Sequence, residues 1–288
     1  MASHTIYPAA QLCADFISKS LTSSEHTQRP LFVGFQGPQG SGKTTLTSQI
    51  KTVLGTLPTP IHAIVFSIDD LYLPYEGLVR LGQANPDNAL LQGRGLPGTH
   101  DPVLGADILE RLSRINGESD GLVSLPTFDK SAYRGFGDRS RETVEVRPPV
   151  DVVILEGWCF GFQPLSLAEL EKRYNGRPET EGGAESKRAS FTWFNHEKLT
   201  VCVVNGEQIV PENLYDVFNW RLQQEHAMKL KNGGHGMTDE EVHNFVARYM
   251  PGYELFQDTI ESRSNPWIGY GLKVVLDKQR VVIRTEEF

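Results

Sequence analysis

Residues 31–44, LFVGFQGPQGSGKT, decide the fold. Within them, residues 37–44 match the pattern G-x-x-x-x-G-K-[ST] without a mismatch. The apolar run 31–35 before the pattern is typical of a strand, and residues 43–54 after it have helical character. Glycines permit the turns that point successive backbone N–H groups inward, and a helix N-terminus adds positive potential at the same place. This order of elements predicts a loop that binds the phosphates of a nucleotide.

The residues of this loop have expected roles toward ATP and Mg²⁺. Lys43 would reach the β- and γ-phosphates, and the Thr44 hydroxyl would be a ligand of Mg²⁺. The weaker alternative is a glycine-rich turn without a ligand. The pattern alone does not separate kinases from GTPases, motors or transporters, but the sequence lacks the guanine-reading motif N-K-x-D. The residues expected to contact the nucleotide are Gly37, Pro38, Gln39, Gly40, Ser41, Gly42, Lys43, Thr44 and Thr45.

The rest of the chain predicts an α/β fold with a parallel sheet covered by helices on both faces. Short apolar runs at 61–68, 150–155 and 198–204 are typical of buried strands, and helical stretches separate them. Two further runs, 273–276 and 281–284, predict a closing β-hairpin. We expect residues 1–288 to form a single domain.

Helices are expected at both ends of this core. The first ~30 residues carry apolar side chains at roughly helical spacing and predict a packed N-terminal helix. Residues 214–231 form a long helical stretch that would close over the site as a lid. Thr238 opens another helix, with Glu241 completing a capping box, and we expect Pro251 to end that helix.

Carboxylates follow two of the predicted strands. Asp69 and Asp70 come directly after the run 61–68, and Glu156 follows the run 150–155. Parallel strands deliver their C-terminal ends to the ligand crevice, so these groups are expected near the phosphates. One aspartate could accept the proton of an attacking hydroxyl, and Glu156 could hold Mg²⁺ or orient the acceptor. The alternatives are turn or cap chemistry for the aspartates and a solvated strand end for Glu156.

Two loops and one helix supply candidate cations. The segments 92–101 (QGRGLPGTHD) and 125–139 (LPTFDKSAYRGFGDR) are dense in glycine and cations, as suits an anionic substrate. Structural surface loops with solvated charges are the alternative. Arg221 could reach the transferring phosphoryl group from the lid, or it could simply pair with Glu225 one turn on. The candidate substrate-binding residues of the two loops are Arg94, His100, Asp101, Lys130, Arg134 and Arg139.

Composition argues against several other functions. The chain carries 28 Lys and Arg against 36 Asp and Glu, a net charge of −8, so nucleic acid is not an expected partner. Apolar runs are too short to span a bilayer, and the sequence points to no protein partner. Cys13, Cys159 and Cys202 read as reduced thiols, which together with the absence of a targeting pattern predicts a cytoplasmic protein. Residues 175–190 are polar and predict a flexible insertion.

Taken together, the motifs resemble those of the D-glycerate 3-kinase-like P-loop kinases, and most closely the fungal members. Besides the phosphate loop, the resemblance rests on SIDDLY, RGLPGTHD, LPTFDKSAYRGFGDR, LEGWCFGFQPL, WRLQQEHAMK and GMTDEEVHNFVARYMPGYELF. The resemblance covers roughly residues 31–276. The wider superfamily to which this family belongs includes uridine kinase, phosphoribulokinase and bacterial pantothenate kinase. Plant members have Asn at the position of Leu96.

The resemblance implies a P-loop NTPase core with a five-stranded parallel sheet, in which the strand before Glu156 neighbours the strand before Gly37. It also implies ATP with Mg²⁺, and an alcohol as acceptor. The family motif D-x-[FL]-Y falls on Asp69 and Tyr72, which makes Asp69 the expected general base, with Asp70 and Tyr72 close to the acceptor. Thr44 and Glu156 become the expected Mg²⁺ ligands.

The expected function is therefore an ATP-dependent kinase for a small anionic alcohol, with D-glycerate as the leading acceptor. One alternative is a kinase of the same fold with another acceptor, such as a nucleoside, a sugar phosphate or pantothenate. A second alternative is a regulatory protein that binds ATP without phosphoryl transfer.

Overall fold

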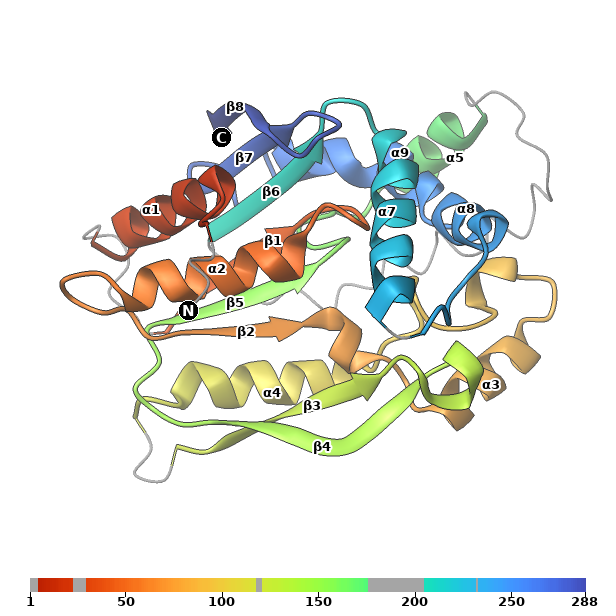
Figure 1. Ribbon diagram of the computed structural model, residues 1–288, viewed down its shortest axis with the longest axis horizontal. Helices are drawn as coiled ribbons and strands as arrows, with labels where there is room; N and C mark the ends of the chain where they lie inside the picture. Colours follow the sequence, from red (N-terminus) through yellow and green to blue (C-terminus); the bar gives the residue numbers. More distant parts are fainter. Residues whose placement is uncertain (1–4, 23–29, 118–120, 176–204, 232) are drawn as a thin grey trace.

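The computed structural model describes residues 5–22, 30–117, 121–175, 205–231 and 233–288. Its centre is a six-stranded sheet in the order β2-β5-β1-β6-β7-β8 (Figure 1). Five strands run parallel, and β8 runs antiparallel to β7. This confirms the parallel core, the closing hairpin and the pairing of β5 with β1. The strands are β1 (Leu31–Gln36), β2 (Ala63–Ser67), β5 (Val152–Gly157), β6 (Asn205–Pro211), β7 (Gly271–Leu276) and β8 (Val282–Glu287).

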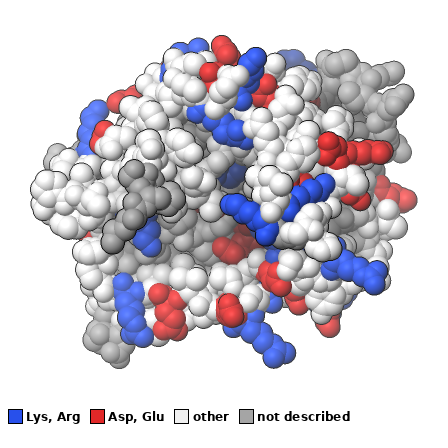
Figure 2. All heavy atoms as spheres, viewed as in Figure 1, with Lys and Arg blue, Asp and Glu red and all other residues white. Residues whose placement is uncertain are grey.

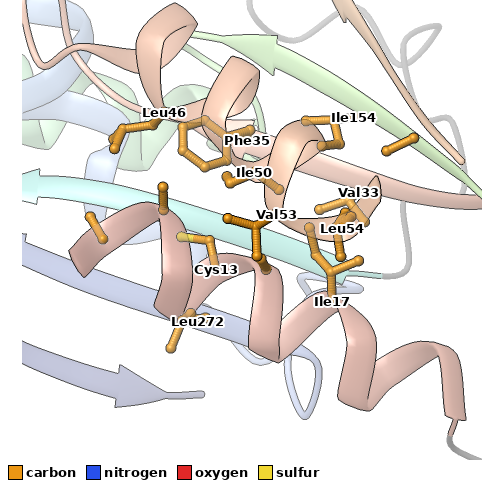
Figure 3. Packing of buried hydrophobic residues seen from close by; sticks show 14 of the residues in the cluster. Cys13, Ile17, Val33, Phe35, Leu46, Ile50, Val53, Leu54, Ile154 and Leu272 are labelled. Atoms are coloured by element: carbon orange, nitrogen blue, oxygen red, sulfur yellow. The ribbon is translucent and has the colours of Figure 1, made fainter. Parts of the chain in front are cut away.

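Helices cover both faces of the sheet (Figure 1). On one face, α1 (Pro8–Thr22) and α2 (Lys43–Gly55) pack against β1, and the side chains of Ile17 and Phe35 are fully buried between them (Figure 3). The α1 helix confirms the predicted N-terminal helix. On the other face, α4 (Pro102–Arg114) packs its apolar side against β5. No helix of the described residues has the length and apolar character that crossing a bilayer requires.

The segment 125–139 is not the loop that the sequence predicted. It belongs to a separate two-stranded antiparallel ribbon of β3 (Val123–Asp129) and β4 (Asp138–Val146). The register shifts between Pro126 and Phe128, and β4 is exposed along most of its length. Because neither strand keeps a regular apolar alternation, the sequence pattern gave no strand signal. Only the turn between the two strands, residues 130–137, remains a loop.

The C-terminal helices differ from the prediction at one proline. The α7 helix (Asp216–Lys231) and the capping box of α8 (Asp239–Ala247) are as expected. Pro251, however, does not end α8: it lies in the first turn of a new helix, α9 (Met250–Phe256). Proline is well tolerated there because the first N–H groups of a helix have no intrahelical partner.

The described part of the chain resumes at β6, directly after the predicted strand 198–204. The predicted strand 198–204 lies outside the described residues, and so do residues 176–190 of the predicted insertion, while β6 begins at Asn205. The polar residues Glu207 and Gln208 interrupt the apolar pattern of β6, although both are almost fully buried.

The shorter elements are α3 (Tyr75–Ala84), α5 (Leu167–Asn175), η1 (Ile68–Leu71), η2 (Ala89–Leu91), η3 (Ala132–Gly135) and η6 (Gln257–Glu261).

Glu207 makes the stability of the protein depend on pH. Its carboxyl lies in the core between α1 and the sheet, where burial raises its pKa to about 8, although the neighbouring Cys13 thiol acts in the opposite direction. Between about pH 4.5 and 8 the folded state therefore keeps a proton that the unfolded chain releases, and stability falls as the pH rises. We expect Glu207→Gln to remove this dependence and to stabilise the protein at pH 7 by about 3 kcal/mol.

Urea unfolding of the wild type and of Glu207→Gln at pH 5 and pH 8 measures this effect. The exposed Glu212, just beyond the end of β6, provides the matched control Glu212→Gln. Parallel pH profiles for the wild type and Glu207→Gln would contradict the prediction.

Candidate active site

The phosphate loop, residues 37–44, connects β1 to α2 and curls around its own backbone. The Pro38 carbonyl accepts hydrogen bonds from Lys43 Nζ at 3.0 Å and from the Ser41 hydroxyl at 2.8 Å. Gly40 and Gly42 have φ angles of +74° and +90°, which side chains other than glycine rarely adopt. The loop thus has the turn geometry that the pattern predicted.

Lys43 lies near both carboxylates of the site. Burial lowers the pKa of its ammonium, and the nearby carboxylates of Glu156 and Asp69 act in the opposite direction. Both carboxylates, which the sequence placed at separate strand ends, therefore lie within electrostatic range of one lysine. The Thr45 side chain, by contrast, is exposed on α2.

Glu156, at the end of β5, faces the start of α2. It is 7% exposed and accepts hydrogen bonds from the hydroxyls of Thr44 at 3.1 Å and Thr47 at 3.0 Å. The hydroxyl of Thr44 and the carboxylate of Glu156 offer the oxygen ligands that Mg²⁺ prefers, so this pair fits the ion. Thr47 was missed by the sequence analysis. It is three residues after Thr44, so the same helical face presents both hydroxyls.

Asp69 and Asp70 lie in η1 and contact different parts of the molecule. Asp69 accepts hydrogen bonds from Lys130 Nζ at 2.6 Å and from the Tyr72 hydroxyl at 2.9 Å. Burial by itself raises the pKa of Asp69, but Lys130 and the Tyr72 hydrogen bond outweigh it and lower the pKa, so the carboxylate stays ionised. Asp70 turns instead to the ribbon and accepts the Phe128 backbone N–H at 3.0 Å. Burial raises the pKa of Asp70 to about 6.

The loop 92–101 packs against η1 through His100 and Asp101. The His100 ring stacks on Tyr72 with centroids 4.4 Å apart. Burial lowers the pKa of His100 to about 4, and its Nε2 is buried without a partner among the described residues. Asp101 caps α4 through the Leu104 N–H at 3.0 Å and pairs with Arg139 at 3.4 Å. His100 is thus a neutral ring with one unused ring nitrogen, while Asp101 acts as a helix cap.

The arginines of the two loops hold backbone carbonyls. Arg94 donates to the carbonyls of Gly135 and Phe136, the latter at 2.7 Å, and Arg139 donates to the Tyr72 carbonyl at 3.0 Å. These contacts tie the ribbon turn to the loop 92–101. Of the two loops' cations, Lys130 and Arg134 are exposed, and Lys130 reaches Asp69.

Leu96, where plant members have Asn, is 5% exposed and packs in the apolar cluster that contains Trp158 and Tyr249. The residue that differs from the plant members is therefore a buried side chain that packs beneath the loop 92–101.

Arg221 makes the contact that the alternative interpretation expected. Its guanidinium pairs with Glu225 at 2.7 Å and lies over the Phe245 ring, 5.4 Å from the centroid. Glu225 is 1% exposed and also accepts the Met237 N–H at 2.7 Å, so the pair links α7 to the start of α8. The backbone of α7 nevertheless packs closely against the phosphate loop. A Cβ placed on Gly40 would lie only 2.6 Å from the backbone nitrogen of Arg221.

Tyr249, between α8 and α9, is a further residue near the site. It is 4% exposed, packs edge-on against Trp158 at 5.1 Å, and places its hydroxyl against Gly95, where a Cβ would not fit. Burial raises the pKa of Tyr249 well above its ordinary value, with the Asp69 carboxylate as the next cause. Tyr249 therefore belongs to the surroundings of Asp69.

Charges of both signs are interspersed over the face of the molecule shown in Figure 2. Among the described residues visible on this face, neither Lys and Arg nor Asp and Glu form an extended patch.

The strand order, the phosphate loop and the carboxylates at the ends of the strands define a P-loop kinase. No protein-family model matches the chain. "Probable ATP-dependent kinase TDA10" of Saccharomyces cerevisiae is 39% identical over 261 residues, 89% of this chain and 88% of that protein. "D-glycerate 3-kinase, chloroplastic" of Arabidopsis thaliana is 39% identical over 235 residues, 80% of this chain and 48% of that protein.

A solved structure of similar sequence extends this likeness to the whole fold. D-glycerate 3-kinase from Cryptococcus neoformans is 40% identical, with a TM-score of 0.90 over 97% of this chain and 99% of that chain. The chain belongs to the D-glycerate 3-kinase-like family of P-loop kinases and is an ATP-dependent kinase.

Proposed function

We propose that this kinase transfers the γ-phosphoryl group of Mg²⁺–ATP to a hydroxyl of a small anionic alcohol, and that D-glycerate is this acceptor, giving 3-phosphoglycerate. The observation that carries the proposal is the position of Asp69: an ionised carboxylate paired with Lys130 at 2.6 Å and within electrostatic range of Lys43. The relatives named D-glycerate 3-kinase support the choice of acceptor.

The reaction needs positioned charges more than covalent chemistry. The backbone N–H groups of residues 37–43 and the Lys43 ammonium would hold the phosphates. Thr44 and Glu156 would hold Mg²⁺, which screens the charge of the phosphates. The acceptor oxygen forms its bond to the γ-phosphorus as the bond to the ADP oxygen breaks, and Asp69 accepts the proton of the acceptor hydroxyl.

The acceptor site follows from which cations have donors to spare. Arg94 and Arg139 donate to backbone carbonyls and so fix the loops around the acceptor site, while Arg139 Nε is buried without a partner among the described residues. Lys130, on the ribbon turn, is exposed and would bind the acceptor carboxylate beside the base. The unused Nε2 of His100 and the hydroxyl of Tyr249 would fix the remaining hydroxyl group of the acceptor. Arg134, exposed on the same ribbon turn, would contribute charge near the acceptor. The free thiols of Cys13 and Cys159 support a cytoplasmic location for this activity.

Acceptor-dependent ADP release tests the proposal. Purified protein with Mg²⁺–ATP is assayed alone and with D-glycerate, L-glycerate, uridine or pantothenate. We expect release that depends on D-glycerate, with the enantiomer L-glycerate as the matched control, and a phosphomonoester on the terminal carbon of the product. Release driven by another alcohol would overturn the acceptor and leave the kinase. Binding of ATP without release from any alcohol would favour the regulatory alternative.

A further inference from the structure

The turn between β7 and β8 carries an arginine with an unusual backbone conformation. Arg280 has a φ angle of +64°, and Asp277 stabilises the turn through its carbonyl, which accepts the Arg280 N–H at 2.9 Å. The Asp277 side chain also accepts the N–H groups of Gln279 at 2.9 Å and Val281 at 2.8 Å. The turn is therefore held from inside, and the arginine side chain leaves it in a defined direction.

That side chain crosses to the phosphate loop and to α7. Arg280 Nε donates to the Gly40 carbonyl at 2.8 Å, Nη2 to the Trp220 carbonyl at 3.1 Å, and Nη1 to Gln223 Oε1 at 2.8 Å. The guanidinium also lies over the Trp220 ring, 5.2 Å from its centroid. Every nitrogen of the guanidinium is thus used within the protein. A lysine could not replace this contact, because it lacks the planar, multiply donating head group.

The bond to the Gly40 carbonyl has a consequence for the neighbouring amide. A trans peptide unit is planar, and its C=O and N–H point in opposite directions. Holding the Gly40 carbonyl toward Arg280 therefore turns the Ser41 N–H to the inside of the phosphate loop. There it donates a hydrogen bond to the Pro38 carbonyl at 3.3 Å, an oxygen of the same loop. An inward N–H at this position is the group that a phosphate loop offers to its ligand.

The backbone of α7 also confines Gly40. A Cβ on Gly40 would lie 2.5 Å from the Trp220 carbonyl carbon, so α7 leaves room only for glycine. The Trp220 indole N–H in turn donates to the Lys278 carbonyl of the β7–β8 turn at 2.9 Å. The turn, α7 and the phosphate loop therefore form one interlocked contact.

We propose that Arg280 is a positioning residue for the nucleotide: it holds the peptide between Gly40 and Ser41 so that the phosphate loop is preorganised for ATP. The C-terminal hairpin thereby becomes part of the nucleotide site, although it lies more than 200 residues from the loop in sequence. This inference rests on the proposed kinase function, since it assigns the loop its ATP. Arg280 touches no reacting atom, and its effect is on binding.

The test compares Arg280→Ala and Arg280→Lys with the wild type. Arg284→Ala, which removes an exposed arginine from β8, is the matched control. The Kd for ATP is measured by calorimetry without acceptor, and the KM values for ATP and for D-glycerate are measured separately. We expect Arg280→Ala to weaken ATP binding by about ten- to a hundredfold, because a charged hydrogen-bond network to the loop is lost. The KM for the acceptor should stay within about twofold, and Arg284→Ala should match the wild type.

Arg280→Lys keeps the charge but cannot hold both carbonyls, so its ATP affinity should also fall, by at least about threefold. This variant decides the matter if Arg280→Ala does not fold. An ATP Kd within about twofold of the wild type in a folded Arg280 variant would overturn the inference, as would equal increases in both KM values. Failure of the wild type itself to bind ATP would instead overturn the proposed function.

Discussion

Replacing Asp69 by Asn is expected to lower kcat by about 10²–10⁴, the usual contribution of a positioned general base, while the Kd for ATP stays within about threefold. Asparagine keeps the size of the side chain and can still accept the Tyr72 hydroxyl, but it cannot take a proton from the acceptor. The carboxylate of Asp69 is suited to the role because Lys130 and Tyr72 bind its two oxygens and keep it ionised. Steady-state kinetics with saturating ATP, together with calorimetry of ATP binding, measures the two effects.

Asp70→Asn is the matched control for this experiment. Asp70 accepts the Phe128 N–H, a bond that asparagine can also make, so kcat should fall by less than about tenfold. A loss at Asp70 as large as that at Asp69 would mean that the two carboxylates act through the shape of η1. Turnover of Asp69→Asn within about tenfold of the wild type would remove Asp69 as the base.

Lys43→Met is expected to lower kcat by about 10²–10³ through the loss of one charge at the phosphates. Methionine has a similar length and an apolar stem, and burial already lowers the pKa of the lysine, so the folded state should tolerate the change. The exposed Lys51 on the same helix gives the control Lys51→Met, which should leave kcat unchanged. Thermal unfolding shows whether the variants are folded, and single-turnover kinetics separates chemistry from binding. Normal single-turnover rates in Lys43→Met would exclude a role for this ammonium in the transition state.

The parts of the fold that the sequence predicted are those in which neighbouring residues carry the physical cause. The connection from β1 through the phosphate loop to α2 depends on glycines at positive φ and on the start of a helix. Both features are determined by consecutive residues of the sequence. The capping box of α8 is likewise local, since Thr238 and Glu241 satisfy each other's backbone. The pairing of β5 with β1 was predicted only through the family resemblance, because strand order depends on contacts between residues far apart in the sequence.

The elements that were missed lack such a local cause. The strand β4 is largely exposed, so its sequence shows no regular alternation of apolar and polar residues. The strand β6 contains the polar residues Glu207 and Gln208, which are buried because helices and neighbouring strands cover them in the folded protein. Pro251 was assigned to a helix end, whereas it opens α9, because proline is compatible with both and the following packing decides between them.

The candidate site divides in the same way. By itself the sequence determined the phosphate loop and the strand-end carboxylates, because residue type and position along a strand are enough to place them at one edge of a parallel sheet. Only the tertiary structure decided that Asp69 pairs with Lys130 and that the side chains of Tyr249 and Arg280 reach the site. These contacts join segments far apart in the chain, and their partners are chosen by which surfaces pack together, a property that no local pattern encodes.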